Sequence, residues 1–445
     1  MTWTKNRQGI ANTMERLDRA LCNAEWRTMF PEATFRVLPR TYSGHSPLVI
    51  YTQAPGTDGI QAIFYHNYWS IVGKSVYVLV NACFRNKSVL ESVIETLIVF
   101  IPKVRPLLDS LVSPNQSSFI PGRNTIDNII ITHEILHTLR HKKGNEGGMI
   151  FKIDLEKAYD KLSWDFIRDT LVEFNMNDNW INLIMSYVSN CKSTILWNRE
   201  ILEGIKNERR LRQDDPHLFV LSMERLSNMI SSNVEGGQWK GIKATRTSPP
   251  ISHLFFADDL ILFAKAYLSN CDTIMSVLSK FCAVAGQKIN HSKSKLFVFP
   301  NLARNKALSL SFYSDIPLTQ NLGKYLGSPM IHGTVNRNMF RETLKKLKNR
   351  LSGWKARTFS LACRTTLIQY VTSAIPSYNM QTMEIPRRVC DEMDRLNCNF
   401  LWGDTDSRKK VHLVNWESVC ISKAKGGLGI RKARDQNAAL LTKLG

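Results

Sequence analysis

The sequence predicts an α+β protein, and three observations support this class. Short apolar strands with acidic residues beside them are predicted at residues 149–154 and 254–263, and the second stretch has the layout of an antiparallel hairpin. Amphipathic helices are predicted before, between and after these strands, where apolar residues recur every three or four positions. The composition, with 43% hydrophobic and 22% charged residues in a chain of 445, is that of a folded protein and excludes wholesale disorder.

The predicted elements follow one another along the chain. A turn-rich joint at residues 51–59 separates residues 1–50 from the rest. A buried strand is predicted over 97–101, a helix over 125–140, a strand over 149–154 and a helix over 164–174. The hairpin has its strands at 254–257 and 260–263 with Asp258 and Asp259 between them, and two further helices are predicted over 340–354 and 389–400.

The chain carries a large excess of positive charge. Lys and Arg number 59 against 38 Asp and Glu, which gives a formal net charge of +21. This excess indicates a polyanionic partner, most often nucleic acid and less often an anionic membrane, although a basic surface can also be simply solvated. The outer face of the helix predicted over 340–354 is basic, and its candidate nucleic-acid contacts are Lys345, Lys346, Lys348 and Arg350.

Several classes are disfavoured by what the sequence lacks. The nine Cys are widely spaced and never form Cys-x-x-Cys, so neither a disulfide framework nor a zinc site is predicted. No apolar stretch reaches the ~18 residues that a membrane span needs. The first ten residues lack the apolar core of a secretory signal. We therefore expect an intracellular protein, in the nucleus or the cytoplasm, with no membrane partner.

Three carboxylates are the main candidates for chemistry. Asp154 ends one predicted strand, and Asp258 and Asp259 lie in the hairpin, so pairing of the strands would bring all three together. Such carboxylates repel one another unless cations lie between them, and oxygen ligands favour Mg²⁺ or Mn²⁺. Two such ions can activate an attacking hydroxyl and stabilise a leaving phosphate. The alternative is a polar hairpin turn and an unrelated strand-end cap, since short motifs also match by chance.

The segments that carry these acids resemble those of a known family. Residues 151–160 (FKIDLEKAYD), 256–259 (FADD) and 116–123 (QSSFIPGR) resemble reverse transcriptases of LINE-type non-LTR retrotransposons, especially those common in plant genomes. Further matching segments cover nearly the whole chain in the family's order: 212–216, 286–290, 323–327, 351–355, 400–403 and 426–429. As a set, these motifs are highly specific.

The resemblance implies a right-hand polymerase with fingers, palm and thumb. It would be an RNA-directed DNA polymerase that uses two Mg²⁺ or Mn²⁺ ions to extend a DNA primer with dNTPs on an RNA template. The fingers and palm would occupy residues 55–300, and the thumb with a mixed helical C-terminal region would occupy 301–445.

The resemblance also implies roles for single residues. Asp154, Asp258 and Asp259 would be the metal ligands. Tyr159 would be the aromatic gate against a ribose 2′-OH, with a core tyrosine as the alternative. Contacts with the nucleotide or the template are implied for the following residues: Lys103, Arg123, Gln213 and Lys293.

Residues 1–50 resemble the tail of the endonuclease that precedes the polymerase in these elements. The matching segments, 16–19 and 43–47, contain Asp18 and His45. In that nuclease an Asp pairs with the His, whereas this chain has Gly44 at that place, and the upstream metal-binding acids are missing. We therefore interpret residues 1–50 as a remnant of an endonuclease/exonuclease/phosphatase-type domain and expect no endonuclease activity.

The sequence departs from the family in the fingers. In this region the chain resembles a partly deleted copy of the family's reverse transcriptase. A basic stretch and a long helix are missing after Val104, and a short segment is missing after Pro216. Asp214 replaces a glycine, which adds like-charge repulsion beside a triphosphate site. Two interpretations follow: a reverse transcriptase of retrotransposon origin with impaired activity, or a catalytically dead remnant that binds nucleic acid.

Overall fold

The computed structural model describes residues 34–37, 48–51, 68–86, 108–141, 147–189, 192–193, 196–197, 200–201, 205–206, 209, 211, 216–245, 247–331, 333–352, 359–404 and 410–443. The chain divides into two compact units, residues 82–335 and residues 1–81 with 336–445. The predicted domain bounds at 50, 55 and 300 stay predictions. The following predicted features lie outside the described residues: the strand over 97–101, Asp18, His45, Lys103, Gln213, Asp214 and Trp354.

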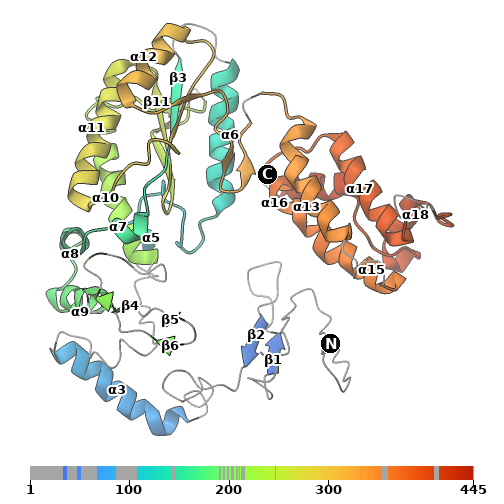
Figure 1. Cartoon of the computed structure of the whole chain (residues 1–445), viewed down its shortest axis with the longest axis horizontal. Coiled ribbons are helices and arrows are strands. Elements are labelled where there is room, and N and C mark those ends of the chain that lie inside the picture. The colour runs from blue at the N-terminus through green and yellow to red at the C-terminus, as the bar shows by residue number, and fades with distance from the viewer. Residues whose placement is uncertain are drawn as a thin grey trace. The chain divides into compact units, whose positions relative to one another are not determined.

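The unit formed by residues 82–335 contains a five-stranded sheet in the order β10-β11-β3-β12-β13 (Figure 1). The central strand, β3, is antiparallel to both β11 and β12, while β12 and β13 are parallel. Covered on both faces, β3 buries Met149, Ile150 and Phe151 completely. The strands are β3 (Gly148–Ile153), β10 (His253–Phe256), β11 (Asp259–Lys265), β12 (Lys295–Val298) and β13 (Leu318–Thr319).

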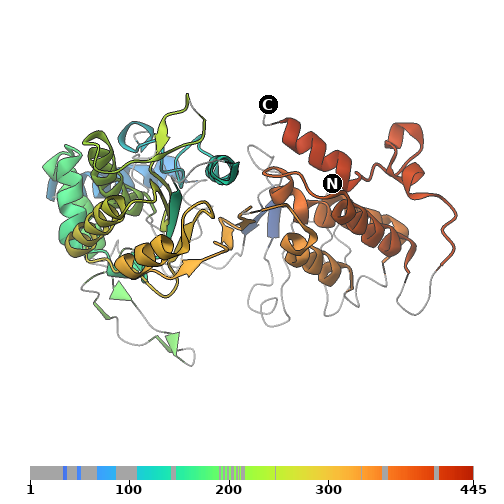
Figure 2. The same ribbon diagram turned by 90° about the horizontal axis from the view of Figure 1, so that it is seen from above.

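Helices cover both faces of this sheet. In both views α10 and α11 lie on one side and α6 on the other (Figures 1 and 2). Their apolar sides supply fully buried residues such as Ile129, Phe219 and Ile274. The helices of the unit are α5 (Leu108–Leu111), α6 (Thr125–His141), α7 (Ala158–Lys161), α8 (Trp164–Glu173), α9 (Asp178–Ser189), α10 (Pro216–Glu235), α11 (Leu268–Ala285) and α12 (Arg304–Ser314).

Pairs of very short strands complete this unit. They are β4 (Lys192–Ser193) with β7 (Ile205–Lys206), β5 (Leu196–Trp197) with β6 (Glu200–Ile201), β8 (Ile242–Lys243) with β9 (Pro250–Ile251), and β14 (Lys324–Tyr325) with β15 (Ser328–Pro329).

The described part of the second unit is mainly helical. One cluster of its core is formed by Ile368, Leu401, Val419 and Ile430. Its elements after residue 336 are η1 (Arg337–Phe340), α13 (Arg341–Ser352), α15 (Leu361–Leu367), η2 (Ile368–Thr372), α16 (Ala374–Met380), α17 (Arg387–Trp402), α18 (Trp416–Cys420), η3 (Lys423–Lys425) and α19 (Ala433–Thr442). The antiparallel pair β1 (Thr34–Val37) and β2 (Leu48–Tyr51) belongs to it, and α3 (Trp69–Asn86) crosses the division between the units.

Most predicted elements in the described ranges are confirmed. The structure has the predicted α+β class. The strand predicted over 149–154 is β3, and the helices predicted over 125–140 and 164–174 are α6 and α8. The helices predicted over 340–354 and 389–400 correspond to α13 and α17, although Phe340 belongs to the 3-10 turn before α13. Among the helices of the described residues, none is long and apolar enough to cross a membrane.

Candidate active site

Asp154 directly follows β3, and its main chain is fixed from the side of β12. Its N–H donates to Ser294 Oγ at 3.0 Å, and its carbonyl accepts from the N–H of Asn290 at 2.8 Å. β3 pairs with β11 up to Ile153, so the next step of this antiparallel register brings Asp154 alongside Asp259. Opposed residues in such a pair have Cα atoms ~4.5–5.5 Å apart. Backbone pairing therefore joins two acids that are distant in sequence.

The hairpin of β10 and β11 presents the other two acids at its tip. Phe256 pairs with Asp259, so the two-residue turn consists of Ala257 and Asp258. The prediction that Asp258 and Asp259 form the turn is wrong by one residue, because Asp259 already belongs to β11. Ala257 has φ +52°, a left-handed conformation that costs a non-glycine residue roughly 1–2 kcal/mol. Asp258 is exposed, and Asp259 is partly buried.

The charges of Asp154 and Asp258 both act on Asp259. Burial raises the pKa of Asp259, Lys152 opposes this shift, and the charges of Asp258 and Asp154 raise the pKa further. Asp259 is therefore close enough to Asp154 and to Asp258 to feel their charges, and any cation that binds there would relieve this repulsion.

Two lysines that the sequence analysis did not single out lie beside these acids. Lys152 stands two residues before Asp154, and side chains at that spacing share one face of a strand. Its cross-strand partner on β12 is Lys295. Burial lowers the pKa of Lys152, while Asp259 raises it and Lys295 lowers it. Lys152 Nζ also donates to the carbonyl of Lys324 at 2.6 Å. Strand alternation could have identified Lys152, whereas Lys295 required the register of β12.

Tyr159 lies on α7, close enough to Asp258 to feel its charge. Its ring stacks on Phe219 of α10, with ring centroids 4.2 Å apart and an interplanar angle of 17°. Burial, followed by the charge of Asp258, raises the pKa of Tyr159 to about 12, so the hydroxyl is neutral at physiological pH. Phe219 thus packs against one face of the Tyr159 ring, while the residue remains only partly buried.

The segment 285–290 fixes the loop between Asp154 and Tyr159. The N–H of Glu156 donates to the carbonyl of Lys288 at 2.9 Å, and Gln287 Nε2 donates to the carbonyl of Ala158 at 2.7 Å. Gly286 has φ +72°, and a Cβ there would lie 2.9 Å from a backbone oxygen. This close approach requires glycine.

Lys293 and Arg123 have different surroundings. Lys293 is exposed in the turn between Asn290 and Ser294, the two residues that hold the main chain of Asp154. The guanidinium of Arg123 instead donates to main-chain carbonyls of the loop before it, including Gln116 O at 2.7 Å, and pairs with Asp109 at 3.0 Å. This arrangement indicates a structural role for Arg123, and the predicted nucleotide or template contacts of both residues stay predictions.

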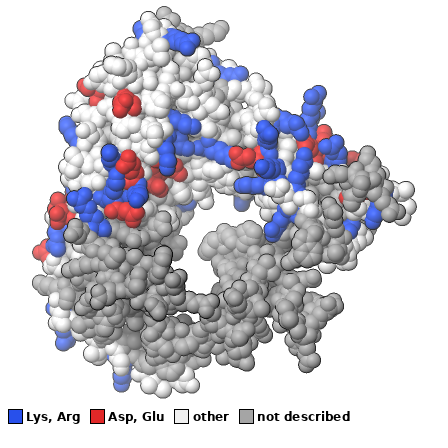
Figure 3. Space-filling view, in the orientation of Figure 1, with Lys and Arg blue, Asp and Glu red and all other residues white. Residues whose placement is uncertain are grey.

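Helix α13 has one buried side and one basic side. Leu344, Leu347 and Leu351 are buried, whereas Lys345, Lys346, Lys348 and Arg350 are exposed. Figure 3 shows Lys and Arg side chains gathered over this helix.

Part of this basic side is already engaged by a carboxylate. Glu392 accepts two hydrogen bonds from Arg337, at 2.8 and 3.1 Å, and lies 3.5 Å from Lys348 Nζ. A cavity of about 500 Å³ opens beside these residues, and its charged lining consists of Arg337, Arg341, Lys345, Lys348 and Glu392. The lining therefore keeps an excess of positive charge.

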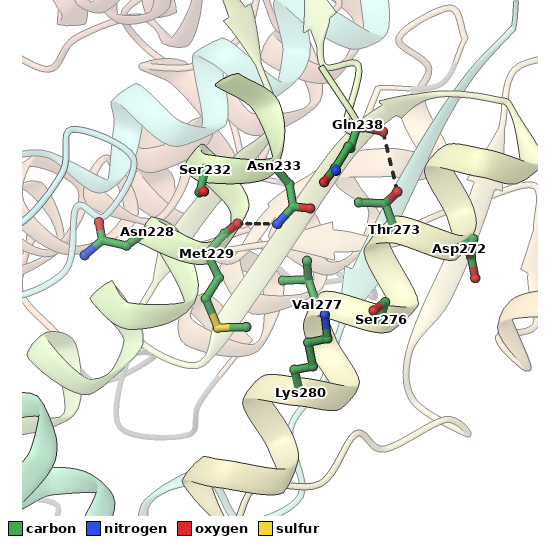
Figure 4. A pocket seen from close by; sticks show the side chains of 10 residues that line it. All are labelled: Asn228, Met229, Ser232, Asn233, Gln238, Asp272, Thr273, Ser276, Val277 and Lys280. Atoms are coloured by element: carbon green, nitrogen blue, oxygen red, sulfur yellow. Dashed lines mark hydrogen bonds between the residues drawn. The ribbon is translucent and has the colours of Figure 1, made fainter. Parts of the chain in front are cut away.

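A cavity of about 470 Å³ also lies between α10 and α11, apart from the three acids (Figure 4). Its lining contains one carboxylate, Asp272, and one ammonium group, Lys280. Two polar contacts lie within its walls: Asn233 Nδ2 donates to Met229 O at 2.8 Å, and Thr273 Oγ1 to Gln238 O at 3.5 Å. None of the predicted catalytic residues lines this cavity.

The three acids have the donor chemistry of a magnesium site. Carboxylate oxygens are the ligands that Mg²⁺ and Mn²⁺ prefer, and the exposure of Asp258 leaves the tip accessible. Within the described ranges, however, no three His, Cys, Asp or Glu side chains are grouped closely enough to hold an ion. Asp154 and Asp258 therefore lie near Asp259, but the three side chains are not grouped tightly enough here to hold an ion.

A buried polar network supports the start of β10. His253 is completely buried, with Nε2 2.8 Å from Ser227 Oγ and 3.1 Å from Asn115 Nδ2, and with Nδ1 2.9 Å from Ser252 Oγ. Burial lowers the pKa of His253 from 6.5 to about 3, so this imidazole is neutral in the folded protein at pH 7.

This pKa shift predicts acid destabilisation through His253. As the pH falls from 6.5 to about 3, the unfolded chain binds the proton that the folded chain refuses, so the stabilisation present above pH 6.5 is progressively lost. His253→Gln keeps hydrogen-bonding groups but does not titrate. In urea unfolding at several pH values, the free energy of unfolding should fall more steeply for the wild type than for the variant. Equal slopes would contradict the assignment.

Comparisons with known proteins bear on this site. The family described as reverse transcriptase (RNA-dependent DNA polymerase) matches residues 86–330, which is more than half of the chain. An uncharacterised protein of the transposon TX1 from Xenopus laevis is 20% identical over 80% of this chain and 29% of its own length. The Pol polyprotein of a type-2 retrotransposable element from Drosophila melanogaster is 27% identical over 48% of this chain and 20% of its own.

A solved structure of Candida albicans telomerase has a TM-score of 0.40 and 10% identity, covering 84% of this chain and 64% of that one. The chain spans less than half of the length of each of the curated relatives that it matches.

Proposed function

Because the chain belongs to the reverse transcriptase family, we propose that it is an RNA-directed DNA polymerase of LINE-type retrotransposon origin whose active site is formed by Asp154, Asp258 and Asp259. One observation carries this proposal: the pairing of β3 with β11 brings Asp154 alongside the two acids of the hairpin tip. The right-hand polymerase fold of the family agrees with the mixed sheet and helices of residues 108–335.

The three acids would hold two Mg²⁺ ions. Ions held there would supply Lewis-acid chemistry, which lowers the pKa of an attacking hydroxyl such as a primer 3′-OH and offsets the negative charge on a leaving pyrophosphate. The chain fixes the positions of the three acids: Asp259 belongs to β11, the main chain of Asp154 is held by Ser294 and Asn290, and Asp258 lies in the turn. Lys152 balances part of the negative charge, and exposed Lys293 would contact the triphosphate.

Tyr159 would lie under the sugar of the incoming nucleotide. The stacking on Phe219 gives the ring a fixed place near Asp258, as a steric gate requires. A neutral hydroxyl adds no negative charge beside the triphosphate. Lys103 and Gln213, which lie outside the described residues, remain predicted contacts with the nucleotide and the template.

The catalytic proposal predicts the result of removing one carboxylate. Because segments are missing after Val104 and Pro216, the wild-type chain should extend oligo(dT) on poly(rA) with dTTP only weakly in the presence of Mg²⁺ or Mn²⁺, and EDTA should abolish the extension. Asp258→Asn should lower the rate about 1,000-fold, because the loss of several kcal/mol of charge stabilisation corresponds to this factor. Asp169→Asn, at an exposed acid of α8, is the matched control and should keep the wild-type rate.

A catalytically dead remnant that binds nucleic acid is the second candidate function. It is favoured by Asp214 and by the segments missing after Val104 and Pro216. If the wild type shows no extension, a repaired chain can be made. It carries Asp214→Gly, Leu-Ser-Pro inserted after Pro216, and the missing fingers segment inserted after Val104. Recovered extension that again needs Asp258 would establish an impaired polymerase, and no recovery would favour the remnant.

The gate proposal predicts a change in sugar selection at Tyr159. Tyr159→Ala removes the ring and should raise the incorporation of rTTP relative to dTTP by at least about tenfold, as for other pocket-volume changes. Tyr159→Phe keeps the ring and should reject rTTP as the wild type does. Single-nucleotide extension with either substrate measures the ratio. The same rejection in all three proteins would assign Tyr159 to the core.

The basic side of α13 would contact nucleic-acid phosphates. Each phosphate contact adds about 0.7–0.9 to the slope of log affinity against log salt concentration. Replacing Lys345, Lys346, Lys348 and Arg350 by Gln should therefore lower the slope by about 3, with Lys348 contributing least because Glu392 already engages it.

Fluorescence anisotropy with a labelled RNA–DNA duplex measures this slope. The control replaces four exposed lysines of the other unit by Gln: Lys240, Lys243, Lys280 and Lys306. If the salt slope changes equally in the control, or does not change in the α13 variant, the basic side of α13 is merely solvated and does not contact phosphates.

A further inference from the structure

The N–H of Ala257, in the turn that presents Asp258, is bound by two side chains from a distant loop. It donates to Ser118 Oγ at 2.8 Å and to Gln116 Oε1 at 3.2 Å. Ser118 Oγ in turn donates to Gln116 Oε1 at 2.8 Å. Gln116 and Ser118 are completely buried, so water does not compete for these bonds. Three donors, including the N–H of Ser118, converge on Gln116 Oε1, which fixes the orientation of its amide.

The loop that carries this pair is itself attached to β10. The N–H of Phe255 donates to the carbonyl of Asn115 at 2.8 Å, and the N–H of Ser117 donates to the carbonyl of Phe255 at 3.2 Å. Arg123 holds the same loop from its other side through the carbonyl of Gln116. The two side chains therefore reach the turn from a support that is anchored on the adjacent strand.

The turn needs such support for two reasons. Ala257 is held at φ +52°, which an alanine rarely adopts without compensation. The turn also carries Asp258 next to Asp259, and these carboxylates repel each other when no cation is bound. The residues that bind Ala257 are uncharged, so they can fix the backbone without competing for a cation or adding to the repulsion.

We propose that Gln116 and Ser118 are positioning residues that hold the strained turn at Ala257 and so preorganise the carboxylate of Asp258 for its metal ion, an inference that rests on the proposed polymerase function. The two side chains touch neither substrate nor ion. They act through one backbone N–H, in the way that partners behind metal ligands orient the ligands themselves.

Ser118→Ala tests this role because it removes only the hydroxyl. In the full chain, hydrogen exchange at the Ala257 N–H should become about tenfold faster, as expected for the loss of one buried hydrogen bond. The affinity for Mn²⁺, measured by electron paramagnetic resonance, should fall about 10- to 100-fold. Ser314→Ala is the matched control, since Ser314 is equally buried and bonds only within α12; it should change neither quantity.

A second substitution separates positioning from general destabilisation. Glycine adopts positive φ without the steric cost, so Ala257→Gly in the Ser118→Ala background should restore most of the Mn²⁺ affinity. An unchanged exchange rate at Ala257 in Ser118→Ala, or no recovery with Ala257→Gly, would overturn the proposal. If the wild type binds no Mn²⁺, the metal site of the proposed function fails, while the exchange rate still decides whether Ser118 holds the turn.

Discussion

The two-sided pairing of β3 is the constraint on which the candidate site depends. One edge of the strand bonds to β11 and sets Asp154 beside Asp259, and the other edge bonds to β12 and brings Ser294 to the N–H of Asp154. Because side chains alternate along a strand, a slip of one residue in either register would move Asp154 to the opposite face. The complete burial of Met149, Ile150 and Phe151 opposes such a slip.

The family motifs act here mainly through the backbone. The segment 286–290 bonds to the loop between Asp154 and Tyr159, and the loop 115–123 bonds to the hairpin tip. Most of their polar side chains therefore hold the chain in place, as Arg123 does with carbonyl groups. The candidate chemistry therefore lies with a few acids, Tyr159 and nearby lysines. Uncharged groups supply the rigidity that preorganised sites require.

Local pattern predicted β3, α6, α8 and α13 because their apolar periodicity coincides with their burial. Two features could not be predicted in this way. The turn lies at Ala257 and Asp258, and the N–H of Ala257 binds distant Gln116 and Ser118, whereas sequence-based turn rules consider only neighbouring residues. Lys295 was missed because its place beside Lys152 follows from the β12 register, a long-range feature. That Asp154 lies near the acids of the hairpin was predictable, because the pairing of β3 with β11 requires it.

The strand order also has a consequence for synthesis of the chain. β3 ends at Ile153, whereas its partners β11 and β12 begin only at Asp259 and Lys295. A growing chain therefore exposes this central strand, which is buried in the folded protein, with both hydrogen-bonding edges open until much of the following sequence has left the ribosome. Such long-range pairing folds slowly and leaves a template for association with other chains. Translation that stops before Asp259 would release a β3 that lacks both partners in this sheet.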